Sequence, residues 1–206
     1  MGTSVTHSDA SASKIGIMGG TFDPIHFAHL AAASEAFDEL QLDEVVFVPA
    51  GDPWQKSGTG VLASEHRLAM TRLATQEDDR FRVSGVDVQR RGATYAVDTV
   101  AAVVAEYDRL VRPYFIIGAD TLERLHTWHR IEDLWKQVTF VVVNRPGHSR
   151  KRVKLPEDAE VIFVDMPGIE VSSTVCRMRA QQGKPLHYLT PSPVVAYIAQ
   201  QRLYRR

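Results

Sequence analysis

Short apolar segments typical of β-strands alternate along this chain with segments of helical periodicity, and this alternation restricts the fold more than any other feature. Residues 114–118 (YFIIG) and 139–143 (TFVVV) are continuous apolar runs, as expected for strands that are covered on both faces. Strands joined through helices require crossover connections, which predict a doubly wound α/β fold with a mostly parallel sheet flanked by helices. The other expected strands are 14–18, 45–49, 81–88 and 161–164, and the expected helices are about 28–40, from 64 onward with a capping box at Ser64, 95–107, 172–181 and 193–201.

Length and cysteine content favour one domain without cross-links. A chain of 206 residues buries a full core, and the single cysteine, Cys176, excludes a disulfide framework and a multi-thiolate zinc site. Residues 1–13 lack periodicity and are expected to form a disordered leader, so that 14–206 form the domain. No run approaches the roughly 18 apolar residues of a membrane helix, and the start lacks the apolar centre of a secretory signal. A cytoplasmic protein with no membrane partner is expected, and its oligomeric state stays open.

The net charge argues against nucleic-acid binding through a basic surface. The formal charge is −1, whereas such binding relies on an excess of Lys and Arg. The basic segment 145–154 (RPGHSRKRVK) has no interleaved aromatic residues and is interpreted as a solvated loop. We therefore expect no nucleic-acid partner.

The segment after the first predicted strand has the features of an anion-binding turn. Gly19 and Gly20 permit a tight turn, and the helix that follows offers free N–H groups and the positive end of its dipole. His26 and His29 are three residues apart, so both can donate to one phosphate. Surface histidines or part of a zinc site explain this pair about as well, although the helix lacks the glutamate of such a site.

A second motif, 171–177 (VSSTVCR), precedes another predicted helix. Ser172 and Ser173 are good N-cap residues, Thr174 falls in the first turn, and Arg177 lies one turn further. Hydroxyls, backbone N–H groups and a guanidinium can therefore converge on one polyphosphate. For Ser172 alone, a plain helix cap is the simpler interpretation.

Together the two motifs resemble those of the nucleotidyltransferase superfamily, G-x-F-D-P-x-H-x-G-H and I-S-S-T-x-I-R, and the chain from Ile15 onward is similar to bacterial nicotinate-nucleotide adenylyltransferases. The resemblance implies a Rossmann-like fold and transfer of the adenylyl group of ATP to nicotinate mononucleotide, giving nicotinate adenine dinucleotide and pyrophosphate. It implies catalytic roles for His26, His29 and Arg177. It also implies Mg²⁺ held mainly by substrate phosphates, with no metal site of the protein's own.

Further residues match the family's substrate-binding segments. The resemblance assigns ATP binding to Gly19, Gly20, Thr21, Phe22, Gly118, Asp120, Ser173 and Thr174, and mononucleotide binding to Lys56, Thr94, Tyr95, Trp128 and Arg145.

Two positions depart from the family pattern. Ala28 replaces the glycine between the two histidines, and Ala96 replaces a hydroxyl residue after Tyr95. We expect altered affinity from these changes and retained chemistry. Two rival functions stay open, namely a related transferase such as phosphopantetheine adenylyltransferase or a cytidylyltransferase, and a nucleotide-binding protein without turnover.

Overall fold

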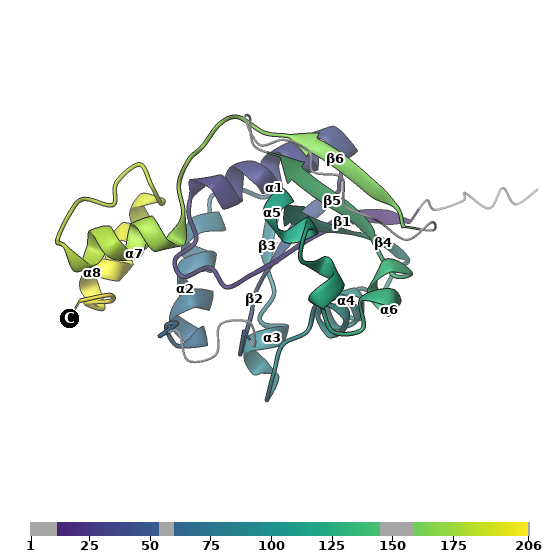
Figure 1. Cartoon of the computed structure of the whole chain (residues 1–206), viewed down its shortest axis with the longest axis horizontal. Coiled ribbons are helices and arrows are strands. Elements are labelled where there is room, and N and C mark those ends of the chain that lie inside the picture. Colours follow the sequence, from purple (N-terminus) through teal and green to yellow (C-terminus); the bar gives the residue numbers. More distant parts are fainter. Residues whose placement is uncertain (1–11, 54–59, 145–158, 206) are drawn as a thin grey trace, which may run out of the picture.

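A computed structural model describes residues 12–53, 60–144 and 159–205 (Figure 1). Strands and helices alternate through most of the chain, as the sequence predicts. In chain order the elements are β1 (Ser13–Gly20), α1 (Phe27–Leu40), β2 (Glu44–Pro49), α2 (Ser64–Thr75), β3 (Phe81–Val83), α3 (Val86–Gln89), α4 (Ala96–Val104), β4 (Val111–Gly118), α5 (Ala119–Leu122), the 3₁₀ turn η2 (Leu125–Thr127), α6 (Ile131–Trp135), β5 (Thr139–Asn144), β6 (Val161–Asp165), α7 (Ser173–Gln181) and α8 (Ser192–Gln200).

The strands form one parallel sheet in the order β3-β2-β1-β4-β5-β6. The chain moves outward from β1 in one direction and then returns to β4 and moves outward in the other, so the order reverses between β1 and β4. Gly20 at the end of β1 pairs with Pro49 of β2, and Gly118 at the end of β4 pairs with Val143 of β5. The expected doubly wound fold is confirmed, and its topological switch point lies at the first glycine turn.

Helices cover both faces of the sheet (Figure 1), and each face has its own apolar core. On one face α1, α2, α7 and α8 contribute buried residues that pack with strand residues such as Phe47 and Ile116. On the other face α4, η2 and α6 pack with strand residues such as Ile17 and Phe140. Burial on both faces explains the continuous apolar runs of the central strands.

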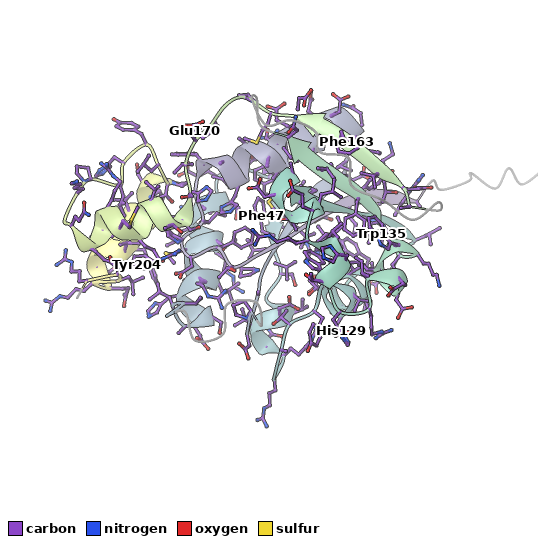
Figure 2. The ribbon with its side chains drawn as sticks, in the orientation of Figure 1. Phe47, His129, Trp135, Phe163, Glu170 and Tyr204 are labelled. Atoms are coloured by element: carbon purple, nitrogen blue, oxygen red, sulfur yellow. The ribbon has the colours of Figure 1, made fainter. Side chains whose placement is uncertain are left out.

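Helices α7 and α8 lie together beside the sheet, near the C-terminal end of the described chain (Figure 1). Figure 2 shows Tyr204 in this part of the molecule, whereas Phe47 lies in the centre. Despite its position, Tyr204 donates from its hydroxyl to Asp23 Oδ1, at 2.7 Å. The last residues of the described chain thus return to the first glycine turn.

Three local predictions were wrong. Ser64 is the first residue of α2 and not its cap, since Ala63 occupies the N-cap position without a side-chain hydrogen bond. The predicted strand 81–88 ends at Val83, because Ser84 Oγ accepts from Val86 N at 3.3 Å and the chain turns into α3. Ser13, which we assigned to the leader, begins β1 and pairs with Val111.

The short helices α5 and α6 and the turn η2 were not predicted. Each has five residues or fewer, too short for helical periodicity to be recognised. No helix in the described parts of the chain has both the length and the apolar character needed to cross a membrane.

Candidate active site

A cavity of about 450 Å³ opens at the carboxyl ends of β1 and β4, at the switch point of the sheet. This volume lies in the range of small-molecule sites. Ten of the predicted site residues line it, namely Gly19, Gly20, Thr21, Phe22, His29, Thr94, Tyr95, Gly118, Asp120 and Trp128.

The turn after β1 is shaped by a close contact between Gly20 and Phe22. A Cβ on Gly20 would lie 2.8 Å from the Phe22 ring, so this position requires glycine. Phe22 has a φ of +49° and is only 2% exposed, and its ring packs against His29 with centroids 5.0 Å apart. The turn therefore presents its backbone to the cavity and supports the imidazole of His29.

His26 and His29 lie side by side but in different environments. Their ring centroids are 3.7 Å apart and their planes differ by 18°, so the rings are stacked. His29 lines the cavity, whereas His26 is the N-cap of α1 and is 3% exposed. His26 N donates to His29 Nδ1 at 3.2 Å. Because Nδ1 accepts, the neutral ring of His29 carries its proton on Nε2, where it is a donor.

The second motif contacts the first motif and does not line the cavity. Ser172 caps α7 by accepting from Val175 N, as the sequence predicts. Ser173 Oγ donates to Pro24 O at 2.8 Å, and Arg177 donates to Asp23 O at 2.8 Å and to Thr174 Oγ1 at 3.2 Å. Ser173, Thr174 and Arg177 thus lie beside the loop that leads to the histidines.

A buried arginine, Arg67 of α2, lies beneath the first turn. It is 1% exposed and donates to three backbone carbonyls, those of Leu62 (3.0 Å), Thr21 (2.9 Å) and Gly51 (2.8 Å). Burial lowers the pKa of its guanidinium, and the carboxylate of Asp23 opposes that effect. An arginine is charged at neutral pH regardless, so the three carbonyls surround a cation.

The wall opposite the histidines is built from the segment that leads into α4. Thr94 Oγ1 accepts from Asp52 N and Thr94 N donates to Asp52 O, both at 3.1 Å. Tyr95 is the N-cap of α4, so Ala96 supplies the first amide of the helix. The N–H of Thr94 is therefore bonded to Asp52, whereas the N–H of Ala96 belongs to the first turn of the helix, whose amides have no partner within the helix.

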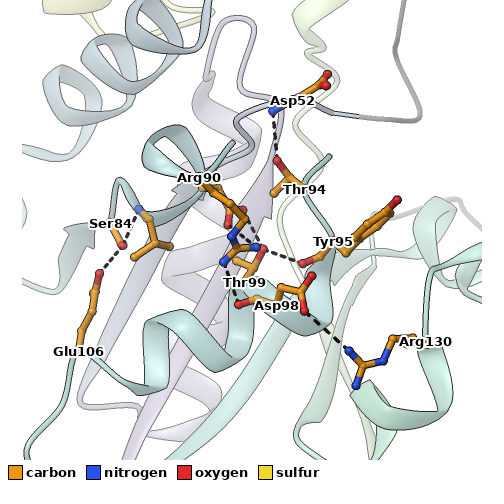
Figure 3. Close-up of polar contacts among 11 residues, drawn as sticks. Asp52, Ser84, Arg90, Thr94, Tyr95, Asp98, Thr99, Glu106 and Arg130 are labelled. Carbon is orange, nitrogen blue, oxygen red and sulfur yellow. Dashed lines mark hydrogen bonds and ion pairs between the residues drawn. The ribbon is translucent and has the colours of Figure 1, made fainter. Parts of the chain in front are cut away.

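A buried carboxylate, Asp87 of α3, contacts this segment at Thr99, which Figure 3 shows beside Tyr95 and Arg90. Its Oδ2 accepts from Thr99 Oγ1 at 2.7 Å, and its Oδ1 lies 3.5 Å from Arg90 Nη1. Thr99 Oγ1 also lies 3.0 Å from Tyr95 O, and Arg90 donates to Asp98 O. Burial raises the pKa of Asp87 to about 6.

Aromatic rings form the remaining wall. Trp128 meets Phe115 edge to face at 5.9 Å, and His129 lies against Tyr95 with centroids 4.2 Å apart. Gly118 lines the cavity, and a Cβ at that position would meet no atom within 4 Å. The space over Gly118 is therefore available to a ligand.

Sequence reasoning missed Arg67, Asp87, Thr99 and His129. Arg67 shares a helix face with buried Met70 and Thr71, which was the one available signal of its burial. Thr99 follows Tyr95 by four residues, but its contact with Asp87 is tertiary. Lys56 and Arg145, predicted to bind the mononucleotide, lie outside the described residues. Within the described ranges no three His, Cys, Asp or Glu side chains are grouped as a metal site.

Comparisons with known proteins show which family the chain belongs to. The profile of the cytidylyltransferase-like family matches residues 17–179. A probable nicotinate-nucleotide adenylyltransferase of Leifsonia xyli subsp. xyli is 46% identical over 198 residues, covering 96% of this chain and 97% of its own. That of Salinispora arenicola is 47% identical, covering 92% and 100%. The structure of Plasmodium falciparum nicotinic acid mononucleotide adenylyltransferase complexed with NaAD is similar in fold, with a TM-score of 0.73 at 18% identity, and the match covers 93% of this chain and 97% of that one.

The chain therefore belongs to the cytidylyltransferase-like family of nucleotidyltransferases. Within that family, identity near 46% over nearly the whole chain places it among the nicotinate-nucleotide adenylyltransferases. The family predicted from the two motifs is confirmed.

Proposed function

We infer that this protein transfers the adenylyl group of ATP to nicotinate mononucleotide, giving nicotinate adenine dinucleotide and pyrophosphate in NAD biosynthesis. The observation that carries this function is that one cavity joins a phosphate-binding type of turn to an aromatic wall. The glycine turn and His29 lie at one end of this cavity, and Tyr95, Trp128 and the first turn of α4 lie at the other. Two nucleotides bound at these ends would meet at the switch point of the sheet.

The reaction requires alignment and charge stabilisation. A 5′-phosphate oxygen of the mononucleotide attacks the α-phosphorus of ATP, a new P–O bond forms, and the bond from the α-phosphorus to the bridging oxygen breaks to release pyrophosphate. No protein nucleophile takes part. Negative charge develops on the bridging and non-bridging oxygens, and positioned donors in a dry site stabilise it. The Nε2–H of His29 is such a donor.

The remaining ATP-side roles follow from placement. The backbone of Gly19 to Phe22 would contact the triphosphate, and Asp120 would accept from the ribose hydroxyls of the adenosine. His26 would orient His29 through the stacked rings and the bond from its own N–H to His29 Nδ1. Arg177 would act on the triphosphate from the start of α7, together with Ser173 and Thr174.

On the acceptor side, Trp128 and Tyr95 would receive the pyridine ring, and the N–H of Ala96 would bind its carboxylate. Thr94 would support this site through its two bonds to Asp52. Lys56 and Arg145 would bind the 5′-phosphate. Mg²⁺ would enter with ATP, because it keeps oxygen ligands from phosphates and water.

The test is pyrophosphate release with ATP, Mg²⁺ and a panel of acceptors. We expect turnover with nicotinate mononucleotide and much less with 4′-phosphopantetheine, and CTP should not replace ATP. Efficient turnover with phosphopantetheine or with CTP would favour a related transferase. No turnover with any acceptor, combined with tight ATP binding, would favour a nucleotide-binding protein.

A further inference from the structure

The ladder between β1 and β2 ends at the edge of the proposed active site. The last paired residues are Gly20 and Pro49, and the last backbone bond runs from Ala50 N to Gly20 O at 2.9 Å. Past this bond β1 continues as the turn of the proposed ATP side, which begins at Thr21, and β2 continues as the loop of the proposed acceptor side, which begins at Gly51. Once the two segments separate, the backbone hydrogen bonds of the ladder no longer connect them.

The Arg67 guanidinium lies at the next position along this ladder. Its Nη1 donates to Thr21 O at 2.9 Å, and its Nη2 donates to Gly51 O at 2.8 Å. These two residues directly follow Gly20 and Ala50, which form the last backbone bond of the ladder. Its Nε donates to Leu62 O at 3.0 Å, which fixes the guanidinium to the segment before α2. A planar guanidinium has a rigid arrangement of donors, so it sets the separation of the two carbonyls.

The Gly51 end of this bridge is held tightly against the acceptor wall. A Cβ on Gly51 would lie 2.1 Å from the backbone oxygen of Asp87, so the loop packs directly on α3. The next residue, Asp52, exchanges two hydrogen bonds with Thr94. Any change in the position of Gly51 is therefore passed to the segment that begins α4.

We propose that Arg67 is a positioning residue that fixes the ATP-side turn at Thr21 relative to the acceptor-side loop at Gly51. It is not among the residues that line the cavity, and it is 1% exposed. Each half of the site retains its own contacts without it, but the distance between the two halves is no longer set. This inference rests on the proposed function, because it concerns the alignment of two substrates of one reaction.

The role predicts a specific kinetic signature. Misplacing reacting groups by about 1 Å can cost about 100-fold in rate, whereas binding of either substrate alone does not depend on the distance between them. In Arg67→Met the guanidinium is lost at similar side-chain length, and in Arg67→Lys a charge remains without the planar arrangement of donors. We expect kcat to fall about 10- to 100-fold in both, with the Kd of ATP alone and of nicotinate mononucleotide alone each within about threefold of wild type.

The matched control is Arg80→Met. Arg80 is also a hydrogen-bonded arginine, paired with Asp78 and bonded to Ser34 Oγ, but it lies outside the cavity lining. Its loss should leave kcat unchanged at a temperature at which circular dichroism shows each variant to be folded. If Arg67→Met does not fold, Gly51→Ala replaces it, because the added methyl displaces the same loop from Asp87 while Arg67 is intact. This variant should lower kcat and leave the Kd of ATP unchanged.

Three arms separate the outcomes. Absence of pyrophosphate release by the wild-type protein with nicotinate mononucleotide contradicts the proposed function itself. With an active wild-type protein, folded Arg67 variants whose kcat stays within about twofold overturn the positioning role. A loss of kcat that is matched by an equal loss of affinity for either substrate alone also overturns it, since Arg67 would then act on one half-site only.

Discussion

His26 and His29 of the first motif have stacked rings but differ in their surroundings. His29 faces the cavity and His26 is buried behind it as the N-cap of α1. The stacked rings and the bond from His26 N to His29 Nδ1 fix the orientation of the exposed imidazole. We therefore expect substitution of His29 to affect chemistry, whereas substitution of His26 affects chemistry and stability together.

His29→Ala should reduce kcat about 100- to 1000-fold, because removal of one transition-state donor costs about 2.7–4 kcal/mol. Its free energy of unfolding should change little. His26→Ala should lower turnover by at least tens of fold and also lower the free energy of unfolding, because it removes a buried ring that is stacked on His29. Steady-state pyrophosphate release and urea unfolding measure the two effects. Near-normal turnover in both variants would contradict the mechanism.

Asp87 gives the free energy of unfolding a defined pH dependence. Its pKa is about 6 in the folded protein against an ordinary value of 3.8, so between these pH values the folded state binds more protons than the unfolded state. The free energy of unfolding should therefore fall as the pH rises from 4 to 6.5, by roughly 2 kcal/mol from this group. Well below pH 3.8 the group is protonated in both states and adds no pH dependence.

The Asp87→Asn variant isolates this contribution. Other carboxyl groups titrate in both proteins, so the difference in free energy of unfolding between wild type and variant should shift against the wild type by roughly 2 kcal/mol from pH 4 to 6.5. Urea unfolding at the two pH values measures it. A difference that stays constant over this range would show that Asp87 titrates normally.

The N-termini of two helices lie at the cavity or beside the motif that forms it. Helix α4 begins after Tyr95, at the acceptor wall, and α7 begins after Ser172, beside the loop that leads to His26. Both N-termini favour negative charge, because N–H groups and the dipole end point outward there. The two helices thus suit a carboxylate and a polyphosphate, respectively.

The start of α4 predicts a preference for the acid form of the mononucleotide. A carboxylate accepts from the N–H of Ala96, whereas a carboxamide presents its own N–H₂ group, and a site of buried donors discriminates strongly against a mismatched ligand. The side chain of Ala96 has no hydroxyl to act as a second donor, so we expect a smaller preference for the acid than such a donor would give. Nicotinate and nicotinamide mononucleotides at equal concentration, with ATP and Mg²⁺, should show a higher kcat/KM for the acid. Equal values would mean that the pocket recognises only ring shape.

Arg177→Ala should mainly weaken the use of ATP. The variant loses the proposed charge-assisted contact of Arg177 with the triphosphate, which is worth about 1.5–3 kcal/mol. It also loses the hydrogen bond from Arg177 to Asp23 O, which connects α7 to the first motif. We expect a higher KM for ATP or a lower kcat, with the KM of nicotinate mononucleotide nearly unchanged. A change confined to the mononucleotide KM would place Arg177 on the other substrate.

The C-terminal residues 189–204 pack against the first motif. Tyr204 donates to Asp23 Oδ1, Thr190 Oγ1 donates to Ile25 O at 2.7 Å, and Phe27 N donates to Leu189 O at 3.1 Å. Burial and the nearby carboxylate of Asp23 raise the pKa of Tyr204, so its hydroxyl stays protonated and donating. The last residues thus help to hold the loop that carries the histidines.

Tyr204→Phe removes this donor and leaves the buried carboxylate of Asp23 without it. The free energy of unfolding should fall by about 1–3 kcal/mol, the cost of an unsatisfied buried group. Tyr188→Phe is the matched control, since Tyr188 is 93% exposed and exposed substitutions change stability by less than about 0.5 kcal/mol. Urea unfolding compares them. Equal stabilities in the two variants would show that the contact of Tyr204 with Asp23 contributes nothing.

The sequence alone determined the features that depend on neighbours along the chain. Continuous apolar runs identified the central strands, because residues buried on both faces of a sheet leave no polar alternation. Ser172 was identified as a cap, because a cap bonds to an amide three residues away. The two motifs also carried the resemblance from which the family was predicted, and the first motif contains residues of the turn that lines the cavity.

The tertiary structure decided what depends on contacts across the chain. Strand 81–88 became a strand of three residues and a helical turn, because Ser84 bonds to Val86 and Asp87 is buried against Thr99. The sequence motif gives no reason to distinguish His26 from His29, yet in the folded protein His29 lines the cavity and His26 is buried. Arg67 looks like an ordinary helix residue until the fold places the carbonyls of Thr21 and Gly51 around it. Such roles follow from distances between segments that are far apart in sequence, and local periodicity carries no information about those distances.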